Sequence, residues 1–168
     1  RKRHKLRIHQ AALIENLLPR LALDIGTPAP DRLIDLFEEN VGDVRLEIGF
    51  GGGEHLIAEA RAFPDIGFIG CEPYVNGMAK ILTQIEAQNI ANIRLYAGDA
   101  AELLAWAPAQ SLARIDLIHP DPWPKRRHWK RRFVQDATVA AMARILRAAG
   151  EFRFVSDIDD YCAWTLAH

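Results

Sequence analysis

The feature that most constrains the fold is a regular alternation that begins at Val44. Short apolar runs are each followed by a stretch in which apolar residues recur with helical spacing. The runs predict five strands, over residues 44–48, 66–71, 93–96, 115–119 and 151–155. Strands that alternate with crossover helices form a parallel, doubly wound sheet, so we expect an α/β fold.

The stretches between the runs predict helices over 54–62, 75–88, 100–105 and 132–148. Asp99 is placed to cap the third of these helices, and Gly150 to end the last as a C-cap. Before Val44 we expect a helix over 10–23 that Pro19 breaks or bends, and a helix over 32–40 capped by Asp31.

The length and composition fit one domain with a substantial core, because 49% of the 168 residues are hydrophobic. We expect a basic arm and helical lead-in over 1–43, and the ligand-binding domain over 44–168. Cys71 and Cys162 are too few and too far apart to predict a disulfide framework or a zinc site. No apolar run has the length of a membrane span, so the expected location is the cytoplasm.

Charge is distributed unevenly although the net charge is only −1. Residues 1–9 carry five Lys/Arg and residues 125–132 carry six, and neither segment contains an acid. The rest of the chain has an excess of acids. Such segregation is typical of a protein that binds a polyanion, although a solvated arm and a solvated helix start would have the same pattern. We expect residues 1–9 to be disordered or loosely docked.

Acidic side chains follow each predicted strand. Ligands of an open α/β sheet bind beyond the carboxyl ends of its strands, where Glu47, Glu72, Asp99, Asp121 and Asp157 are expected. Each of the first three has another possible role, as a surface carboxylate, a helix N-terminal charge or an N-cap. Their occurrence at consecutive strand ends favours a shared binding site.

The loop over 47–54 has glycines at 49, 51, 52 and 53, which does not match the G-x-G-x-x-G pattern of dinucleotide sites. Glu47 directly precedes the turn, where a carboxylate would repel a pyrophosphate and attract a cation. S-adenosylmethionine is a cationic ligand without phosphate. Glu72 would accept hydrogen bonds from the ribose hydroxyls of this ligand, and Asp99 would contact the edge of its adenine.

The stretch 115–132 combines a restrained acid, an aromatic ring and a run of cations. Pro120 and Pro122 restrict the backbone on both sides of Asp121, and Trp123 follows. Six Lys/Arg come next, which we call the basic belt: Lys125, Arg126, Arg127, Lys130, Arg131 and Arg132. The combination predicts a site for a nucleic-acid base. Trp123 is expected either to stack on a base or to pack beneath the loop.

Five motifs resemble those of class I methyltransferases that methylate guanine in tRNA at ring nitrogen 7. They are LEIGFGGGEHL, GCEPY, GDA, PDPWPKRRHWKRR and SDIDDY, and they occur in the family's order between Leu46 and Tyr161. The PDPW block is the most specific. The resemblance implies a Rossmann-like fold, S-adenosylmethionine as the cofactor with S-adenosylhomocysteine as the product, no metal, and tRNA as the partner.

The same resemblance assigns roles to individual residues. Asp121 matches the residue taken as catalytic, at the junction of cofactor and base. The cofactor contacts are expected from Glu47, Gly49, Gly51, Glu72, Asp99, Ala100 and Asp121. Lys125 and Asp157 match positions that contact the substrate. We expect further substrate contacts from Trp123, which precedes the basic belt, and from Arg126, Arg127 and Arg131 within it.

Two departures from the family pattern stand out. The family has an apolar or aromatic residue where this chain has His119, and we interpret this histidine as packed at the strand end rather than as a base. The family also continues with further strands and a Thr-x-x-Glu-type motif, whereas this sequence ends at His168. Because a sheet without its last strands exposes an edge, we expect that this segment was left out of the sequence.

Three alternatives remain from the sequence: a nicotinamide-dependent dehydrogenase, a methyltransferase for another RNA, a small molecule or a protein, and a non-catalytic RNA-binding module. The glycine spacing and Glu47 argue against the dehydrogenase, and the two basic segments argue against a small-molecule or protein substrate. The acids at the strand ends argue against a non-catalytic module. No membrane association and no obligate protein partner are expected, and either a monomer or a homodimer fits.

Overall fold

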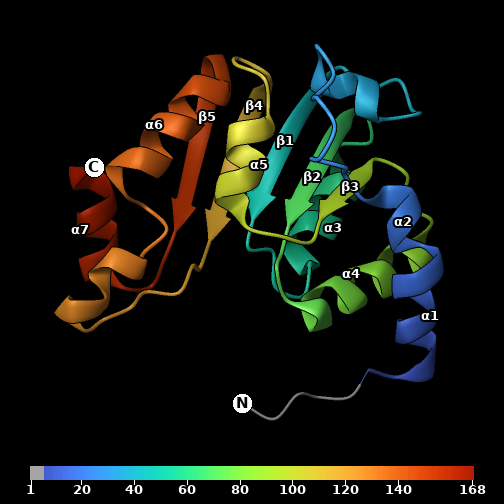
Figure 1. Ribbon diagram of the computed structural model, residues 1–168, viewed down its shortest axis with the longest axis horizontal. Coiled ribbons are helices and arrows are strands. Elements are labelled where there is room, and N and C mark those ends of the chain that lie inside the picture. Colours follow the sequence, from blue (N-terminus) through green and yellow to red (C-terminus); the bar gives the residue numbers. More distant parts are fainter. Residues whose placement is uncertain (1–5) are drawn as a thin grey trace.

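The computed structural model describes residues 6–168, and a single sheet of five strands organises it (Figure 1). All neighbouring strands are parallel, and their order is β3-β2-β1-β4-β5. The strands are β1 (Asp43–Ile48), β2 (Ile66–Cys71), β3 (Ile93–Tyr96), β4 (Leu112–Ile118) and β5 (Leu146–Val155). The prediction of a parallel, doubly wound α/β sheet is therefore confirmed.

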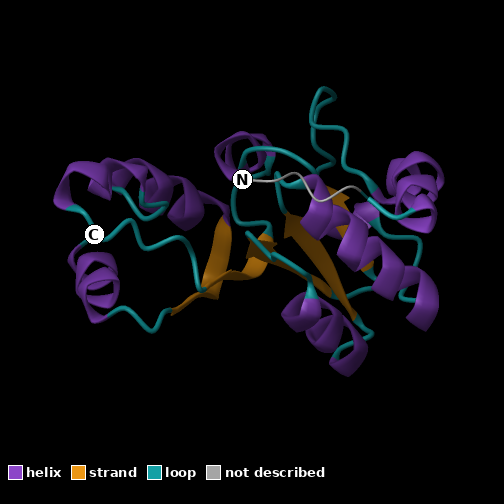
Figure 2. Cartoon of the chain, turned by 90° about the horizontal axis from the view of Figure 1, so that it is seen from below, coloured by secondary structure: helices purple, strands orange, loops and turns teal. Residues whose placement is uncertain are grey.

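Helices cover both faces of the sheet, as Figure 2 shows from the edge at which the strands end. The α-helices are α1 (Ile8–Asn16), α2 (Leu18–Leu21), α3 (Glu54–Ala62), α4 (Val75–Gln88), α5 (Ala100–Trp106), α6 (Asp136–Ile145) and α7 (Asp159–Ala167). Two 3-10 helices are η1 (Leu33–Leu36) and η2 (Arg126–Arg131). Among the described residues, no helix combines the length and the apolar character needed to cross a membrane.

Two hydrophobic cores lie on opposite faces of the sheet because successive side chains of a strand point to opposite sides. In β2, Phe68 packs into the core formed with α1, α3 and α4, whereas Ile69 packs into the core formed with α5 and α6. The chain runs from β1 outward to β2 and β3, and then returns to β4 beside β1. This reversal leaves a crevice at the carboxyl ends of β1 and β4.

Local sequence signals predicted the central elements correctly. Helices α3 and α4 have the predicted bounds, and so do β2 and β3. The Asp99 carboxylate accepts a hydrogen bond of 2.8 Å from the Ala101 amide, which caps α5 as predicted. Cys71 is buried and Cys162 is half-buried, and both are free thiols.

The predicted helix over 132–148 is wrong at both ends. Residues 126–131 form η2, and α6 begins only at Asp136, where Gln135 and Thr138 form a capping box. Leu146 already belongs to β5, so Gly150 lies within a strand rather than at a helix end. The pairing of β5 with β4 is irregular between Leu112 and Arg114, and Ala149 has a φ of 60° there.

The segment before β1 also differs from the prediction. The break expected at Pro19 in the helix over 10–23 is confirmed, because α1 ends at Asn16 and Pro19 lies in the first turn of α2, but the bounds are shifted to Ile8–Asn16 and Leu18–Leu21. The helix expected over 32–40 is reduced to η1, which Asp31 does not cap, because Leu33 and Phe37 turn into the core instead. Of the basic arm, residues 1–5 lie outside the described residues, whereas Ile8 and His9 already belong to α1.

Asn92 offers a test of the packing between α3, β2 and β3. Its buried side-chain amide donates to the carbonyl oxygens of Ala60, Phe63 and Ile66, at 3.0, 3.1 and 2.8 Å. The substitution Asn92→Ala leaves these acceptors without that donor and should lower the free energy of unfolding by about 1–3 kcal/mol. Urea unfolding measures this change, and Gln84→Ala, which removes an exposed amide on α4, should stay within about 0.5 kcal/mol of the unsubstituted protein. An equal effect of both substitutions would contradict the prediction.

Candidate active site

A cavity of about 410 Å³ lies at the carboxyl ends of β1, β2, β3 and β4, and we call it the strand-end cavity. Its volume is in the range of small-molecule sites. It is lined by Ile48, Gly49, Cys71, Pro73, Gly98, Asp99, Ala100, Pro120, Asp121, Trp123, Arg131 and Phe133. Segments that are far apart in the sequence therefore meet where the switch in strand order places a site.

The glycine loop between β1 and α3 needs glycine at several positions. Gly49, Gly51 and Gly53 have φ values of 69°, 58° and 85°, in the left-handed region that other residues rarely adopt. A Cβ atom at Gly49 or Gly51 would meet nothing within 4 Å. The space beside this backbone is therefore open to a ligand.

Glu72 is buried at the end of β2 and holds the glycine loop in place. Its Oε2 atom accepts a hydrogen bond of 2.9 Å from the Gly51 amide, and its Oε1 atom accepts one of 3.0 Å from the Tyr74 amide. A carboxylate has about four acceptor positions, so each oxygen retains capacity for a second hydrogen bond. Glu72 itself is not a lining residue, but its neighbours Cys71 and Pro73 are.

Asp99 lines the strand-end cavity while it caps α5 through Oδ1. Its two expected roles, as an N-cap and as a binding-site acid, are therefore compatible. Ala100, the next residue, also lines the cavity.

Cys71 is a lining residue whose thiol is buried. Burial, reinforced by the charges of Glu72 and Asp99, raises the pKa of the Cys71 thiol to about 12. At neutral pH this thiol is protonated, so it packs and does not act as a nucleophile.

Asp121 lies on a loop whose backbone is strained on both sides. His119 and Trp123 have φ values of 47° and 43°, and Pro120 and Pro122 lie between them. The His119 amide donates to the Val155 carbonyl oxygen at 2.7 Å, which ties the start of the loop to β5. Non-glycine residues in this region cost about 1–3 kcal/mol each and persist only where their surroundings impose the conformation. The loop holds Asp121 in the cavity wall with little freedom.

Trp123 is half-buried at the wall of the strand-end cavity. The Arg131 guanidinium lies 5.0 Å from its ring centroid, and the His128 ring packs against it edge-on at 5.8 Å. The indole thus packs against neighbours in its own loop and also lines the cavity, and stacking on a base stays a prediction.

The basic belt is divided by the fold. Lys125, Arg126 and Arg127 are exposed at the start of η2 and do not line the strand-end cavity, whereas Arg131 does. Arg132 is buried, with a side chain that is 0% exposed. Its assignment to the belt is therefore wrong: aromatic side chains of η2 and α7 enclose it.

His119 is not packed at the strand end as expected. Its side chain is 60% exposed, because the chain turns through a positive φ directly after β4. The Nδ1 atom of His119 lies 3.9 Å from the exposed Asp157 carboxylate, which precedes α7. These two side chains lie beside the strand-end cavity without lining it.

Glu47 does not line the strand-end cavity. It is buried, and its Oε2 atom lies 2.6 Å from Nδ1 of His55 on α3. The other ring nitrogen of His55 lies 2.9 Å from the Arg153 guanidinium. Burial raises the pKa of the Glu47 carboxyl, and the contact with His55 opposes this change.

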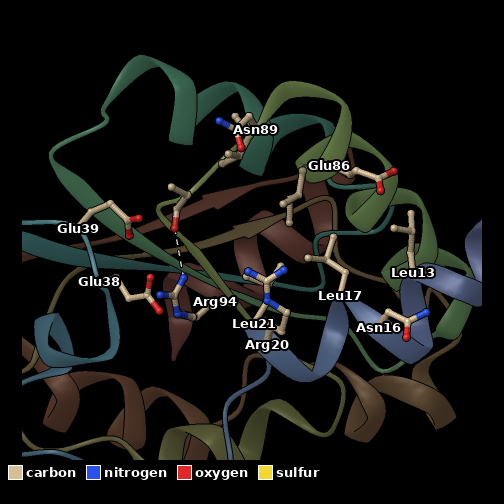
Figure 3. A pocket seen from close by; sticks show the side chains of 13 residues that line it. Leu13, Asn16, Leu17, Arg20, Leu21, Glu38, Glu39, Glu86, Asn89 and Arg94 are labelled. Carbon is tan, nitrogen blue, oxygen red and sulfur yellow. Dashed lines mark hydrogen bonds between the residues drawn. The ribbon is translucent and has the colours of Figure 1, made fainter.

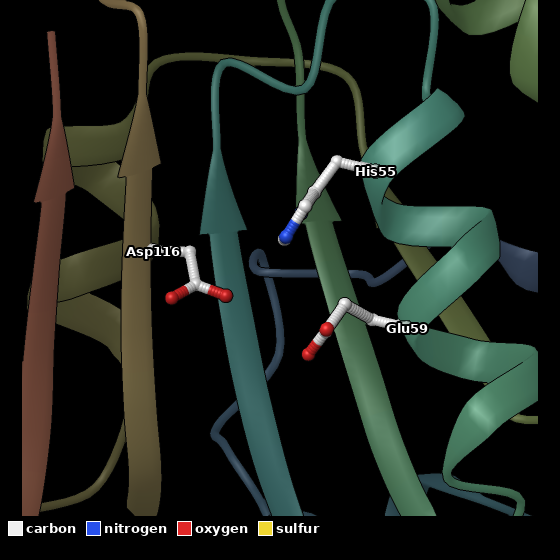
Figure 4. Close-up of side chains that lie close together, drawn as sticks. All are labelled: His55, Glu59 and Asp116. Atoms are coloured by element: carbon white, nitrogen blue, oxygen red, sulfur yellow. The ribbon is translucent and has the colours of Figure 1, made fainter.

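His55, Glu59 and Asp116 lie close together on this face of the sheet, with one ligand-type atom from each within 4.8 Å of the others (Figure 4). Their carboxylates already have cationic partners. Asp116 accepts hydrogen bonds of 3.1 Å from Arg114 and 2.8 Å from Arg153, and Glu59 is paired with Arg114. The cluster is therefore an ion-pair network and offers no free carboxylates to a metal.

Sequence reasoning missed this network, although a signal for it exists. Arg114 and Asp116 alternate with Ile115 and Leu117 in β4. Such alternation places the charged pair on one face of the strand and the apolar pair on the other. A strand covered by apolar helices on both faces would be apolar throughout.

A second hollow of about 690 Å³ lies between α1, α2 and the end of α4 (Figure 3). Leu13, Leu17 and Leu21 form its apolar wall, and Glu38, Glu39 and Arg94 lie among its polar residues. It contains none of the acids that follow the strands. The strand-end cavity is therefore the candidate active site.

Comparisons with known proteins agree with the geometry. Residues 42–168 match a family model described as "Putative methyltransferase". The chain is 78% identical over all 168 residues to a tRNA (guanine-N(7)-)-methyltransferase of Rhodopseudomonas palustris, and 76% identical to one of Bradyrhizobium diazoefficiens. It spans 67% and 71% of these proteins, respectively, or about two thirds of their length.

Solved structures share the fold at low sequence identity. A SAM-dependent O-methyltransferase of Thermotoga maritima has a TM-score of 0.58 at 14% identity, over 99% of this chain and 50% of that one. The 16S rRNA methyltransferase KamB has a TM-score of 0.56 at 17% identity, over 77% of this chain and 60% of that one. These structures show the fold, whereas the family model and the relatives that are 76–78% identical show that the chain belongs to the tRNA (guanine-N(7)-)-methyltransferase family.

Proposed function

We propose that the protein binds S-adenosylmethionine in the strand-end cavity and transfers a methyl group to ring nitrogen 7 of a guanine in tRNA. One observation carries this proposal. A single cavity brings together the glycine loop, the carboxylates of Asp99 and Asp121, and the aromatic and cationic side chains of Trp123 and Arg131. Relatives that are 76–78% identical bear the name of this activity.

The residues present suit this cofactor. The open backbone at Gly49 and Gly51 leaves room for a ligand, and Asp99 and the adjacent Glu72 retain acceptor capacity for its hydroxyl and amino groups. Arg131 is the sole cation among the described lining residues, so the wall favours a cationic ligand without phosphates. When bound, S-adenosylmethionine supplies an electrophilic methyl group on a sulfonium centre. No metal is needed for this transfer.

The chemistry requires positioning more than proton transfer. Nitrogen 7 of guanine carries an in-plane lone pair and acts as an acceptor, so no base has to deprotonate it. Asp121 is held on the strained loop at the cavity wall, where its carboxylate would orient the base edge and stabilise the positive charge that develops on the purine. Trp123 would stack on the base or on a neighbouring nucleotide.

The exposed cations of the belt would contact the RNA backbone. Lys125, Arg126 and Arg127 project from the start of η2, next to the cavity wall that contains Arg131. Phosphate contacts give affinity and orientation with little sequence specificity. Asp157, exposed before α7, is a further substrate contact in this proposal.

The decisive experiment incubates the protein with a labelled methyl donor and unmodified tRNA, and then maps any 7-methylguanine by reductive cleavage of the RNA. Label at one guanine supports the proposal. Label in a small molecule or protein indicates another methyltransferase, and RNA binding without label indicates a binding module. A parallel titration with S-adenosylhomocysteine and with NADH tests the dehydrogenase alternative.

Asp121→Ala should separate catalysis from cofactor binding. The substitution removes the carboxylate next to the reacting base, so methyl transfer should fall by about 10²–10³-fold. Binding of S-adenosylhomocysteine, measured by calorimetry, should weaken only modestly. Asp136→Ala, which removes an exposed carboxylate on α6, is the matched control. Near-normal turnover of Asp121→Ala would exclude the catalytic role.

Glu72→Ala should act mainly on cofactor binding. It removes the acceptor for the ligand's hydroxyls and also the bond that holds the Gly51 amide, so affinity for S-adenosylhomocysteine should fall by about 10- to 100-fold. Glu54→Ala, an exposed acid at the start of α3, should have little effect. Equal calorimetric affinities of the two variants would contradict the assignment of Glu72.

Affinity for tRNA should depend strongly on salt. Five cations of the belt remain exposed: Lys125, Arg126, Arg127, Lys130 and Arg131. If each neutralises one phosphate, log affinity should fall with log salt at a slope of about −4, which is a loss of a few hundred-fold between 50 and 200 mM. Filter-binding titrations measure the slope. An affinity that does not respond to salt would contradict the belt's role.

A further inference from the structure

Arg132 is the one cation of the basic belt that the fold buries. Its guanidinium lies 4.8 Å from the ring centroids of Trp129 and Tyr161, and 5.2 Å from that of Trp164. We call these three rings the aromatic cage. Cation–π contacts of this kind are strongest where water is excluded, and the Arg132 side chain is 0% exposed.

The polar contacts of Arg132 reach two separate segments. Its Nε atom donates a hydrogen bond of 2.9 Å to the carbonyl oxygen of Pro122, and its Nη2 atom pairs with the Asp160 carboxylate in the first turn of α7. Its Nη1 atom is buried and has no partner among the described residues. The pair joins a buried guanidinium to a carboxylate that is 56% exposed, so it offsets only part of the cost of burying the charge, and stability alone does not account for an arginine here.

The first of these contacts bears on Asp121. Pro122 directly follows Asp121, and the positive φ values of His119 and Trp123 are on either side of the pair. A strained loop keeps its conformation only if surrounding contacts impose it. The hydrogen bond from the Arg132 side chain to the Pro122 carbonyl directly restrains the middle of this loop.

The second contact fixes α7 against the same wall. The Tyr161 hydroxyl accepts a hydrogen bond of 3.1 Å from the Phe133 amide, and Phe133 lines the strand-end cavity. The Trp164 indole donates to the Val134 carbonyl oxygen at 2.7 Å. The loop that leads into α7 contains Asp157. One guanidinium thus joins the segment of Asp121 to the segment of Asp157.

We propose that Arg132 is a positioning residue for methyl transfer, which acts through the Pro122 carbonyl and the aromatic cage to fix Asp121 in the strand-end cavity. It is not an RNA contact, in contrast to its neighbours in the belt. This inference rests on the function proposed above and adds a residue that touches neither cofactor nor RNA.

The test compares Arg132→Met with Lys130→Met. Methionine keeps an unbranched side chain within the cage but cannot donate to Pro122. In Arg132→Met, kcat should fall by about 100-fold, the result expected of a small misplacement at the reacting centre, with KM for tRNA and the salt slope unchanged. In Lys130→Met, an exposed cation of the belt is lost, so the salt slope should decrease by about one. Lys80→Met removes an exposed cation on α4, outside the belt, and should leave both kcat and the salt slope unchanged.

Arg132→Lys supplies the conservative variant. An ammonium group keeps the charge in the cage, but it cannot reach both Pro122 and Asp160 as the planar guanidinium does. We expect kcat to lie between those of the unsubstituted protein and Arg132→Met. A folded Arg132→Met with unchanged kcat would overturn the proposal, and so would a loss of salt slope equal to that of Lys130→Met.

Hydrogen exchange measures the positioning directly and without RNA. Exchange of the amides of His119, Asp121 and Trp123 should be faster in Arg132→Met and unchanged in Lys130→Met. If the unsubstituted protein methylates no tRNA, the proposed function fails, and exchange alone decides whether Arg132 holds the loop. If neither Arg132 variant folds, Asp160→Asn replaces them, and unchanged exchange with unchanged kcat then overturns the proposal.

Discussion

The structure depends on one constraint, which is that the carboxyl ends of parallel strands meet at a single edge of the sheet. The order β3-β2-β1-β4-β5 places the glycine loop after β1 beside the loop after β4, although about 70 residues separate them in the sequence. Asp99 and Asp121 line one cavity only because of this order. The positive φ of Gly49 then keeps the backbone open toward that cavity.

The two faces of β4 serve different purposes. Ile115 and Leu117 point into the core under α5 and α6, whereas Arg114 and Asp116 join the ion-pair network on the face that carries α3. Glu47 belongs to this network through His55. Glu47, near the end of β1, therefore contacts α3 through His55, whereas Glu72 makes the direct hydrogen bond to the glycine loop.

The basic belt is divided in a similar way. Five of its cations are exposed and available to a polyanion, whereas Arg132 turns inward to the aromatic cage. An arginine suits this place better than a lysine because its planar group stacks on rings while it donates along two directions. The same short segment thus presents charge outward and restrains the loop of Asp121 from within.

The sequence alone determined the parallel sheet, the bounds of α3, α4, β2 and β3, the cap at Asp99 and the strand-end position of the acids, because these follow from local periodicity, glycine and capping chemistry. It also predicted the family through motifs in fixed order. Only the tertiary structure decided that Arg132 is buried, that Glu47 faces His55, and that residues 146–150 join β5. Those outcomes depend on which distant segment supplies the partner: α7 for Arg132, α3 for Glu47 and β4 for the start of β5. No local pattern specifies such a partner.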